Sequence, residues 1–194
     1  MLSPVGALSN GLELLRDERD SEMRRRCMEL LEQSARISAD KLKFFRLAYG
    51  AAGGFGDTVP SEEPRELVAA LVGGNGRVAL DWAVANEILP KAAVKVLLNL
   101  AAIGLDALPR GGELQVGAEQ RDGATEIAVR AAGAKIAFDP AIGHALDGTL
   151  PDDQLSGRTA PAHLIRLIAE ESGGGLQYAL TDGALVMGAV LPDA

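Results

Sequence analysis

Cysteine, histidine, aromatic side chains and long apolar runs are all scarce in this chain. The single cysteine, Cys27, excludes an internal disulfide framework and a cysteine-based zinc cluster. The two histidines, His144 and His163, leave few ligands for any other metal site. No apolar run approaches the ~20 residues of a membrane helix, and Met1-Leu2-Ser3-Pro4 lacks the basic and apolar regions of a signal peptide. We therefore expect a cytoplasmic protein with no membrane segment and no metal.

The charge is acidic and unevenly distributed. The 194 residues are 47% hydrophobic and 24% charged, which is enough to bury the core of one large or two small domains. A net charge of -8 argues against a nucleic-acid binder, which needs a basic surface to neutralise phosphates. Residues 1–50 hold 9 basic and 8 acidic side chains, whereas residues 51–194 hold 10 and 19. This asymmetry indicates two bodies with different partners.

Residues 3–52 predict a helical hairpin. Leu8, Leu12 and Leu15 recur at coiled-coil spacing, and Asp20 or Ser21 can cap a second helix after a charged break. The second helix has a wide apolar face, made of Met23, Cys27, Leu30, Leu31, Ile37, Leu42, Phe44, Phe45 and Leu47. One partner helix cannot cover this face, so we expect a homodimer in which two hairpins form a four-helix bundle. The alternative is that the face packs on the rest of the same chain.

The pattern changes after the Gly-rich segment 50–60, where we place a domain boundary that separates residues 1–55 from residues 60–194. Residues 62–72 and 91–108 read as helices, and residues 78–84 alternate as a half-buried strand does. Two hairpins carry the Asp-Gly turn signal, at Asp122-Gly123 and Asp182-Gly183, with short helices near 140–147 and 161–172 between them. This order predicts an α+β sandwich with helices on one face of a mixed sheet.

Three segments of the sandwich resemble the nucleotide-binding boxes of sensor histidine kinases. Residues 98–112 resemble the N box, in which a second Asn coordinates Mg²⁺ between the ATP phosphates. Ile103 stands at that position and offers no oxygen ligand, whereas Asn99 matches the first, structural Asn. The resemblance implies the fold of a kinase ATPase domain from which the metal ligand has been lost.

The other two boxes are altered in the same way. Residues 129–136 resemble the G1 box and keep Gly133, but Ala131 replaces the adenine-binding Asp and Lys135 replaces the second Gly. Residues 157–163 resemble the G2 box and keep only Gly157 of its three glycines. The order and spacing of the boxes imply a degenerate ATPase domain that binds no ATP and no other cofactor. The alternative is an unrelated sandwich that happens to carry a Gly-Gly turn and a helical Asn.

The hairpin resembles that of ChpT-type histidine phosphotransferases, through residues 3–15 and through Ser34-Ala35-Arg36 with the residues up to Ala51. In that family the first helix carries His-Asp-x-x-Ser-Pro, and the histidine passes a phosphoryl group between receiver aspartates. Ser3 and Pro4 match the end of this motif, so the His and Asp are expected just before Met1. No catalytic residue can therefore be assigned within the chain. We expect that the true start lies upstream; the chain as written would not relay phosphate.

The resemblance also implies where a response regulator docks. The nominated positions are Ala7, Asn10, Gly11, Leu14, Phe44 and Tyr49. The alternative for Gly6 and Gly11 is that they only ease the crossing of the two helices. The run Arg24-Arg25-Arg26 reads as a solvated face that could also meet the acidic surface of a receiver. Cys27 and Trp82 read as core residues.

Together these features predict a homodimeric histidine phosphotransferase of a phosphorelay. Its partners would be a hybrid histidine kinase and response-regulator receiver domains, with no nucleic acid and no membrane. One alternative is a non-catalytic adaptor that only binds receivers. The other is an ATP-dependent sensor histidine kinase, which needs an oxygen ligand at position 103 and an acid at position 131 and has neither.

Overall fold

The computed structural model describes residues 4–50, 56–74 and 76–193. The chain divides into two compact units, which we call the hairpin unit (residues 1–45) and the sandwich unit (residues 46–194). The division falls inside a helix, a few residues before the Gly-rich segment at which the sequence predicts the boundary. Ser3 lies outside the described residues. Within those residues, no helix combines the length and the apolar character that crossing a membrane requires.

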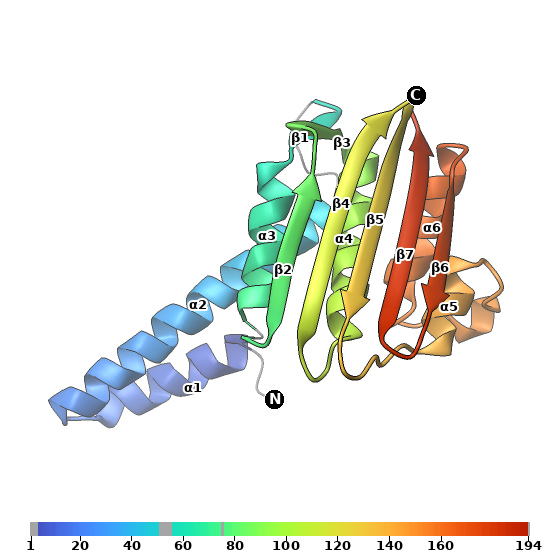
Figure 1. Cartoon of the computed structure of the whole chain (residues 1–194). Coiled ribbons are helices and arrows are strands. Elements are labelled where there is room, and N and C mark those ends of the chain that lie inside the picture. Colours follow the sequence, from blue (N-terminus) through green and yellow to red (C-terminus); the bar gives the residue numbers. More distant parts are fainter. Residues whose placement is uncertain (1–3, 51–55, 75, 194) are drawn as a thin grey trace. The chain divides into compact units, whose positions relative to one another are not determined.

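Two helices account for the predicted hairpin. Helix α1 runs from Pro4 to Asp17, and α2 runs from Ser21 to Tyr49, so that its last turn belongs to the sandwich unit (Figure 1). Asp20 caps α2 as expected, because its Oδ1 accepts a hydrogen bond of 2.8 Å from the backbone N–H of Met23. The helical hairpin predicted from the sequence is therefore confirmed.

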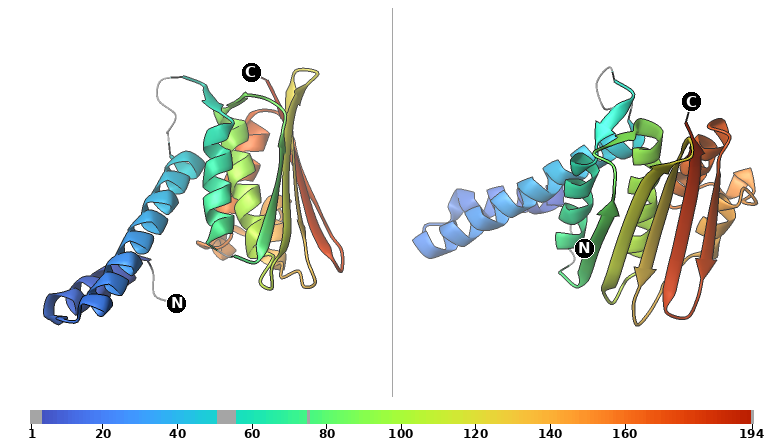
Figure 2. Two further views of the ribbon diagram at one scale, coloured as in Figure 1. Left: turned by 60° about the vertical axis from the view of Figure 1, so that its left-hand side comes forward. Right: turned by 45° about the horizontal axis from the view of Figure 1, so that its top comes forward.

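The sandwich unit pairs one mixed sheet with a layer of helices. Its elements are β1 (Thr58–Pro60), α3 (Glu62–Gly73), β2 (Val78–Val84), β3 (Ile88–Pro90), α4 (Lys91–Asp106), β4 (Gly112–Arg121), β5 (Ala124–Ala132), α5 (Pro140–Leu146), a 3-10 turn (Asp152–Gln154), α6 (Ala160–Glu171), β6 (Gly175–Leu180) and β7 (Ala184–Pro192). The main sheet has the order β2-β4-β5-β7-β6; β2 and β4 are parallel and the other pairs antiparallel. The helices lie on one face of it (Figure 2). The predicted α+β class is confirmed; the sequence patterns predicted neither the small antiparallel sheet of β1 and β3 nor the 3-10 turn.

The two Asp-Gly hairpins turn in different ways. Asp122 and Gly123 both have positive φ, of 52° and 78°, which is the tight turn that this dipeptide favours. In the second hairpin, the backbone N–H of Thr181 donates to the carbonyl of Ala184 at 2.9 Å. The N–H of Ala184 donates in return to the Thr181 hydroxyl, at 3.1 Å. A side chain therefore completes the second turn.

The core lies between α4 and the sheet. Fully buried side chains come from both layers: Leu97, Leu98 and Leu100 of α4, and Leu114, Leu185 and Met187 of the strands. Along β5 and β7 buried residues alternate with exposed ones, so one face of the sheet meets the helices and the other is open. Cys27 is buried as predicted, whereas Trp82, which the sequence assigned to the core, is only half-buried.

Candidate functional site

The two positions that would bear nucleotide chemistry lie in the apolar core. Ile103 of α4 is 7% exposed and Ala131 of β5 is fully buried. Helix α4 approaches β5 closely between them, since a Cβ placed on Gly104 would lie 3.6 Å from Cβ of Ala131 and 2.9 Å from Cδ1 of Leu114. Both side chains are apolar, so neither supplies the oxygen ligand or the hydrogen-bond acceptor that the kinase boxes have at these positions.

The segment after β5 packs directly on the end of α4. The backbone N–H of Ala137 donates to the carbonyl of Ala107 at 3.0 Å, and that of Gly133 donates to Gly183 at 3.1 Å. A Cβ on Gly133 would lie only 2.7 Å from the carbonyl oxygen of Gly111. The retained glycine of the G1 box therefore serves the packing of two backbone segments, with no need for a nucleotide to explain it.

The remaining positions of the degenerate boxes differ in burial. Lys135 is exposed, and a Cβ on Gly157 would meet no atom within 4 Å. Thr159, which stands where the G2 box has a glycine, is buried and accepts a hydrogen bond of 2.9 Å from the backbone N–H of Ser156 through its hydroxyl. The N–H groups that could hold a phosphate in a working G2 box are thus partly engaged within the local turn.

Asn99 fits the structural role that the resemblance implies. Its side chain is fully buried, and its Nδ2 donates to the carbonyl of Lys95 at 2.8 Å and to that of Ala48 at 3.5 Å. Ala48 lies in the last turn of α2, where backbone carbonyls have no partner within the helix. Asn99 therefore helps to hold this turn against α4.

A small charged cluster, which the sequence did not suggest, lies where α4 ends. Burial raises the pKa of Asp106, an effect that the nearby Arg158 opposes. The Arg158 Nε is 3.2 Å from a carboxylate oxygen of Asp139, which also caps α5. Burial, and then the charge of Asp106, raise the pKa of Tyr49. The cluster joins residues far apart in sequence, and its single guanidinium is already engaged by carboxylates.

Grooves of about 640 and 250 Å³ lie on the strands of the main sheet. None of the six positions of the degenerate nucleotide boxes lines either groove. Among the described residues, no group of three or more His, Cys, Asp or Glu is placed to hold a metal ion.

The nominated docking positions differ in accessibility. Asn10 and Leu14 of α1 are exposed, Leu14 by 65%, while Ala7 is half-buried and Tyr49 is 40% exposed. A Cβ on Gly11 would lie 2.8 Å from Cδ2 of Leu31, which favours the alternative that this glycine lets α1 and α2 cross closely.

Phe44 requires a correction, because its side chain is only 4% exposed and is not accessible to a partner. The neighbouring Phe45 is 52% exposed and has the accessibility that docking needs. Both lie in the predicted apolar face, and hydrophobicity alone does not say which of two adjacent aromatic rings points outward.

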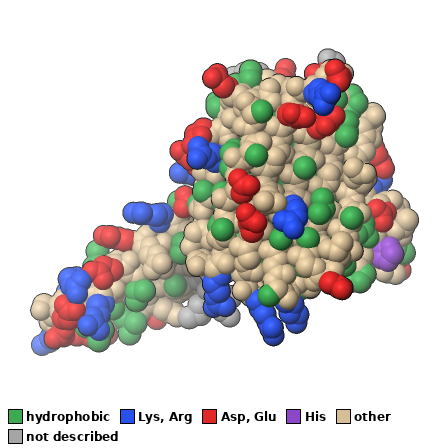
Figure 3. All heavy atoms as spheres, viewed as in Figure 1, with side chains coloured by type: hydrophobic (Ala, Val, Ile, Leu, Met, Phe, Trp, Pro, Cys, Tyr) green, Lys and Arg blue, Asp and Glu red, His purple; other side chains and the backbone are tan. Residues whose placement is uncertain are grey.

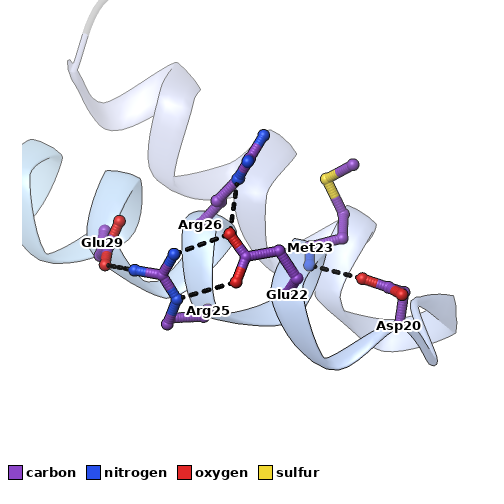
Figure 4. Close-up of polar contacts among 6 residues, drawn as sticks. All are labelled: Asp20, Glu22, Met23, Arg25, Arg26 and Glu29. Carbon is purple, nitrogen blue, oxygen red and sulfur yellow. Dashed lines mark hydrogen bonds and ion pairs between the residues drawn. The ribbon is translucent and has the colours of Figure 1, made fainter.

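The arginine run forms contacts within the hairpin unit (Figure 4). Arg25 pairs with Glu22 and Glu29, and the Arg26 Nε lies 3.1 Å from Glu22, so that these two arginines lower the pKa of Glu22. Arg24 donates to the backbone carbonyls of Leu15 and Glu18, at 3.1 and 3.0 Å, and links α2 to the end of α1. These contacts agree with a solvated face.

The two histidines are outside the hairpin unit. His144 is exposed on the short helix α5, and its Nδ1 lies 3.0 Å from the Thr149 hydroxyl. His163 is half-buried on α6. Neither is part of the N-terminal segment whose Ser3-Pro4 resembles the end of a phosphoacceptor motif.

Comparisons with known proteins agree with this geometry. Residues 61–184 match the profile of a family described as "Histidine phosphotransferase C-terminal domain". The protein phosphotransferase ChpT of Brucella abortus (strain 2308) is 34% identical over 173 residues, which cover 89% of this chain and 81% of that protein. The solved structure of a bacterial phosphotransferase superposes with a TM-score of 0.82 at 31% identity, covering 96% of this chain and 88% of that one.

The sandwich unit also has the fold of kinase ATPase domains. The catalytic domain of the histidine kinase ThkA matches 70% of this chain and 95% of its own length, with a TM-score of 0.52 and 16% identity. This likeness concerns the fold, and it confirms the architecture that the three degenerate boxes predict.

Proposed function

Because this chain belongs to the histidine phosphotransferase family, we propose that it receives a phosphoryl group from the receiver domain of a hybrid histidine kinase and passes it to response regulators. The observation that carries this proposal is the match to phosphotransferases along both units, 96% of the chain in the structural comparison. The single cysteine agrees with a cytoplasmic setting for this exchange.

The chemistry is a reversible transfer between an aspartyl phosphate and an imidazole. A neutral imidazole nitrogen attacks the phosphorus, the bond from phosphorus to the aspartate oxygen breaks, and the carboxylate leaves. An acid beside the ring orients it and holds its other proton. The proposed acceptor is the His of a His-Asp pair that the family motif places just before Met1, adjacent to Ser3 and Pro4.

We propose that the chain carries out this transfer without binding ATP. Support comes from the apolar side chains at positions 103 and 131 and from the direct packing of residues 133–137 on the end of α4. Docking is proposed for Ala7, Asn10, Gly11 and Leu14 on α1, together with Tyr49 and with Phe45 in place of Phe44. The hairpin is nearly neutral, so the acidic pocket of a receiver can approach it with little repulsion.

A His-Asp pair added directly before Met1 is expected to create a competent relay protein. With a phosphorylated receiver of a hybrid kinase as donor, the extended chain should take up labelled phosphate and deliver it to a second receiver. A matched variant with Gln-Asp before Met1 should take up none, because glutamine has no nucleophilic ring nitrogen.

Two results would contradict the relay. Equal binding of receivers by both variants without any exchange of label would favour the adaptor. Labelling from ATP and Mg²⁺ in the absence of a donor receiver would favour a kinase.

We propose further that two hairpins associate into a four-helix bundle. Leu12, Leu30 and Leu42 are 63%, 62% and 69% exposed in the single chain, which is a large cost for leucine side chains left in water. Light scattering at micromolar concentration is expected to give twice the 20.2 kDa of one chain.

The variant Leu30→Glu with Leu42→Glu is expected to be a folded monomer, since both side chains are exposed before association. The control Glu32→Gln, at another exposed position of α2, should remain a dimer. A monomer in the unmodified chain contradicts the bundle.

A further inference from the structure

The open face of the main sheet has a feature that the phosphorelay does not use. Five residues, Ala83, Gly117, Ala128, Gly188 and Gln177, stand side by side across β2, β4, β5, β7 and β6. The first four are small, and all five line the groove of about 640 Å³. Figure 3 shows this face of the molecule, with acidic, basic and hydrophobic side chains around it. We call it the cross-strand groove.

The two glycines of the groove are not required by the fold. A Cβ on Gly117 would be 3.7 Å from its nearest neighbour and one on Gly188 would be 3.5 Å away, which are ordinary contacts. Neither has the positive φ that favours glycine. By contrast, a Cβ on Gly174 would lie 1.9 Å from the carbonyl oxygen of Val190. Glycine inside a strand weakens the strand and often marks the close approach of another molecule.

The walls of the groove are the next rows of side chains along the strands. One wall contains Glu119, Glu126 and Val190, and the other contains Ala179 and Val186. Residues on one face repeat every two positions, so the walls are about 13 Å apart. An α-helix with its side chains is about 10–12 Å across, which is comparable to this spacing of the backbone rows. Five strands span about 19 Å, which is the length of roughly 13 helical residues.

The charges of the walls favour a basic occupant. Glu119 and Glu126 are directly opposite each other on β4 and β5, an arrangement of like charges that destabilises a sheet. In the described part of the chain, neither has a cation nitrogen within 4.0 Å. The nearby Arg121 is paired with Asp122, and Arg130 donates to Gln115 at 3.1 Å. Lys or Arg from a partner would relieve the repulsion between the two glutamates.

We propose that the cross-strand groove docks a basic amphipathic helix of a partner protein. The small floor admits the apolar face of that helix, and Glu119 and Glu126 bind its cations. The same carboxylates repel nucleic acid, and in a two-fold contact between copies of this face they would meet one another. The inference does not depend on phosphotransfer, so its failure leaves the proposed function intact.

Model peptides test the inference on the full chain. The probe is a 14-residue peptide of Lys, Ala and Leu with its lysines on one helical face; the comparison peptides are a scrambled sequence and a version with Glu for Lys. The patterned Lys peptide is expected to bind about tenfold tighter than the scrambled one. In NMR spectra of the full chain, the amide chemical-shift changes caused by the patterned peptide should fall on residues of β4, β5 and β7. Equal binding of the scrambled peptide, preference for the Glu peptide, or shifts elsewhere would overturn the proposal.

Variants separate the groove from general charge effects. Glu119→Gln with Glu126→Gln should weaken binding of the patterned peptide about tenfold, and the matched pair Glu66→Gln with Glu171→Gln, on exposed positions of α3 and α6, should not. Gly117→Val with Gly188→Val should also abolish binding while the protein keeps its fold, because both positions have room for a side chain. The control Gly157→Val should bind as the unmodified chain does. If the groove variants and the control variants lost peptide binding equally, specific binding in the cross-strand groove would be contradicted.

Discussion

Replacing Ala131 by Asp, the acid of a working G1 box, is expected to lower the free energy of unfolding by about 3–5 kcal/mol and to restore no nucleotide binding. Position 131 is fully buried beside Gly104, Leu114 and Val129, so the new carboxylate would have neither water nor a cation. Chemical denaturation followed by circular dichroism measures the loss, and calorimetric titration with an ATP analogue and Mg²⁺ measures binding.

The same substitution three residues earlier provides the control. Ala128→Asp lies on the exposed side of β5 and should change the free energy of unfolding by no more than about 1 kcal/mol. Two results would contradict the proposal that the chain has no nucleotide site. One is that the Ala131→Asp variant is as stable as the Ala128→Asp variant, and the other is that the double variant Ile103→Asn with Ala131→Asp binds the ATP analogue.

Replacing Gly112 by Ala is expected to be at least as disruptive, with a loss of about 3 kcal/mol or more. Gly112 has a φ of +143°, and a Cβ there would lie 2.1 Å from the carbonyl oxygen of Ala132. No side chain fits without separating the start of β4 from the end of β5, which pair at this point. Thermal unfolding of the purified variant measures the loss.

Gly157 is the matched control, since it is also a glycine retained from the degenerate boxes. A Cβ at this position meets nothing within 4 Å, so Gly157→Ala should change stability by about 0.5 kcal/mol or less. A large loss of stability in the Gly157→Ala variant, or no loss in the Gly112→Ala variant, would contradict the conclusion that packing requires a glycine at position 112 and not at position 157.

Two of the retained glycines have roles in packing that do not depend on nucleotide chemistry. At Gly112 and Gly133 the neighbouring backbone segments lie too close for a side chain, and these contacts do not depend on a ligand. The side chains at positions 103 and 131 are apolar and lie in the core, where their burial stabilises the fold. The packing of the sandwich unit is therefore enough to explain why Gly112 and Gly133 still match the kinase boxes.

Much of the architecture could be predicted from local patterns. The helical hairpin, the cap at Asp20, the two Asp-Gly hairpins and the order of elements in the sandwich all follow from periodicity and turn chemistry within short windows. Such features depend on neighbours in sequence, whose contacts are set by the repeat of a helix or strand. The family assignment likewise rested on motifs that are contiguous in the chain.

Other features required the tertiary structure. The sequence could not decide that Phe44 is buried and Phe45 exposed, nor that Arg158 pairs with Asp139 and opposes the effect of burial, which raises the pKa of Asp106. The cross-strand groove is a sharper case, because its small residues come from five strands and line up only through four separate registers. A shift of one residue in any register would send that strand's small residue to the opposite face. Local periodicity determined the elements and their order, whereas pairing between distant segments decided which side chains share a surface.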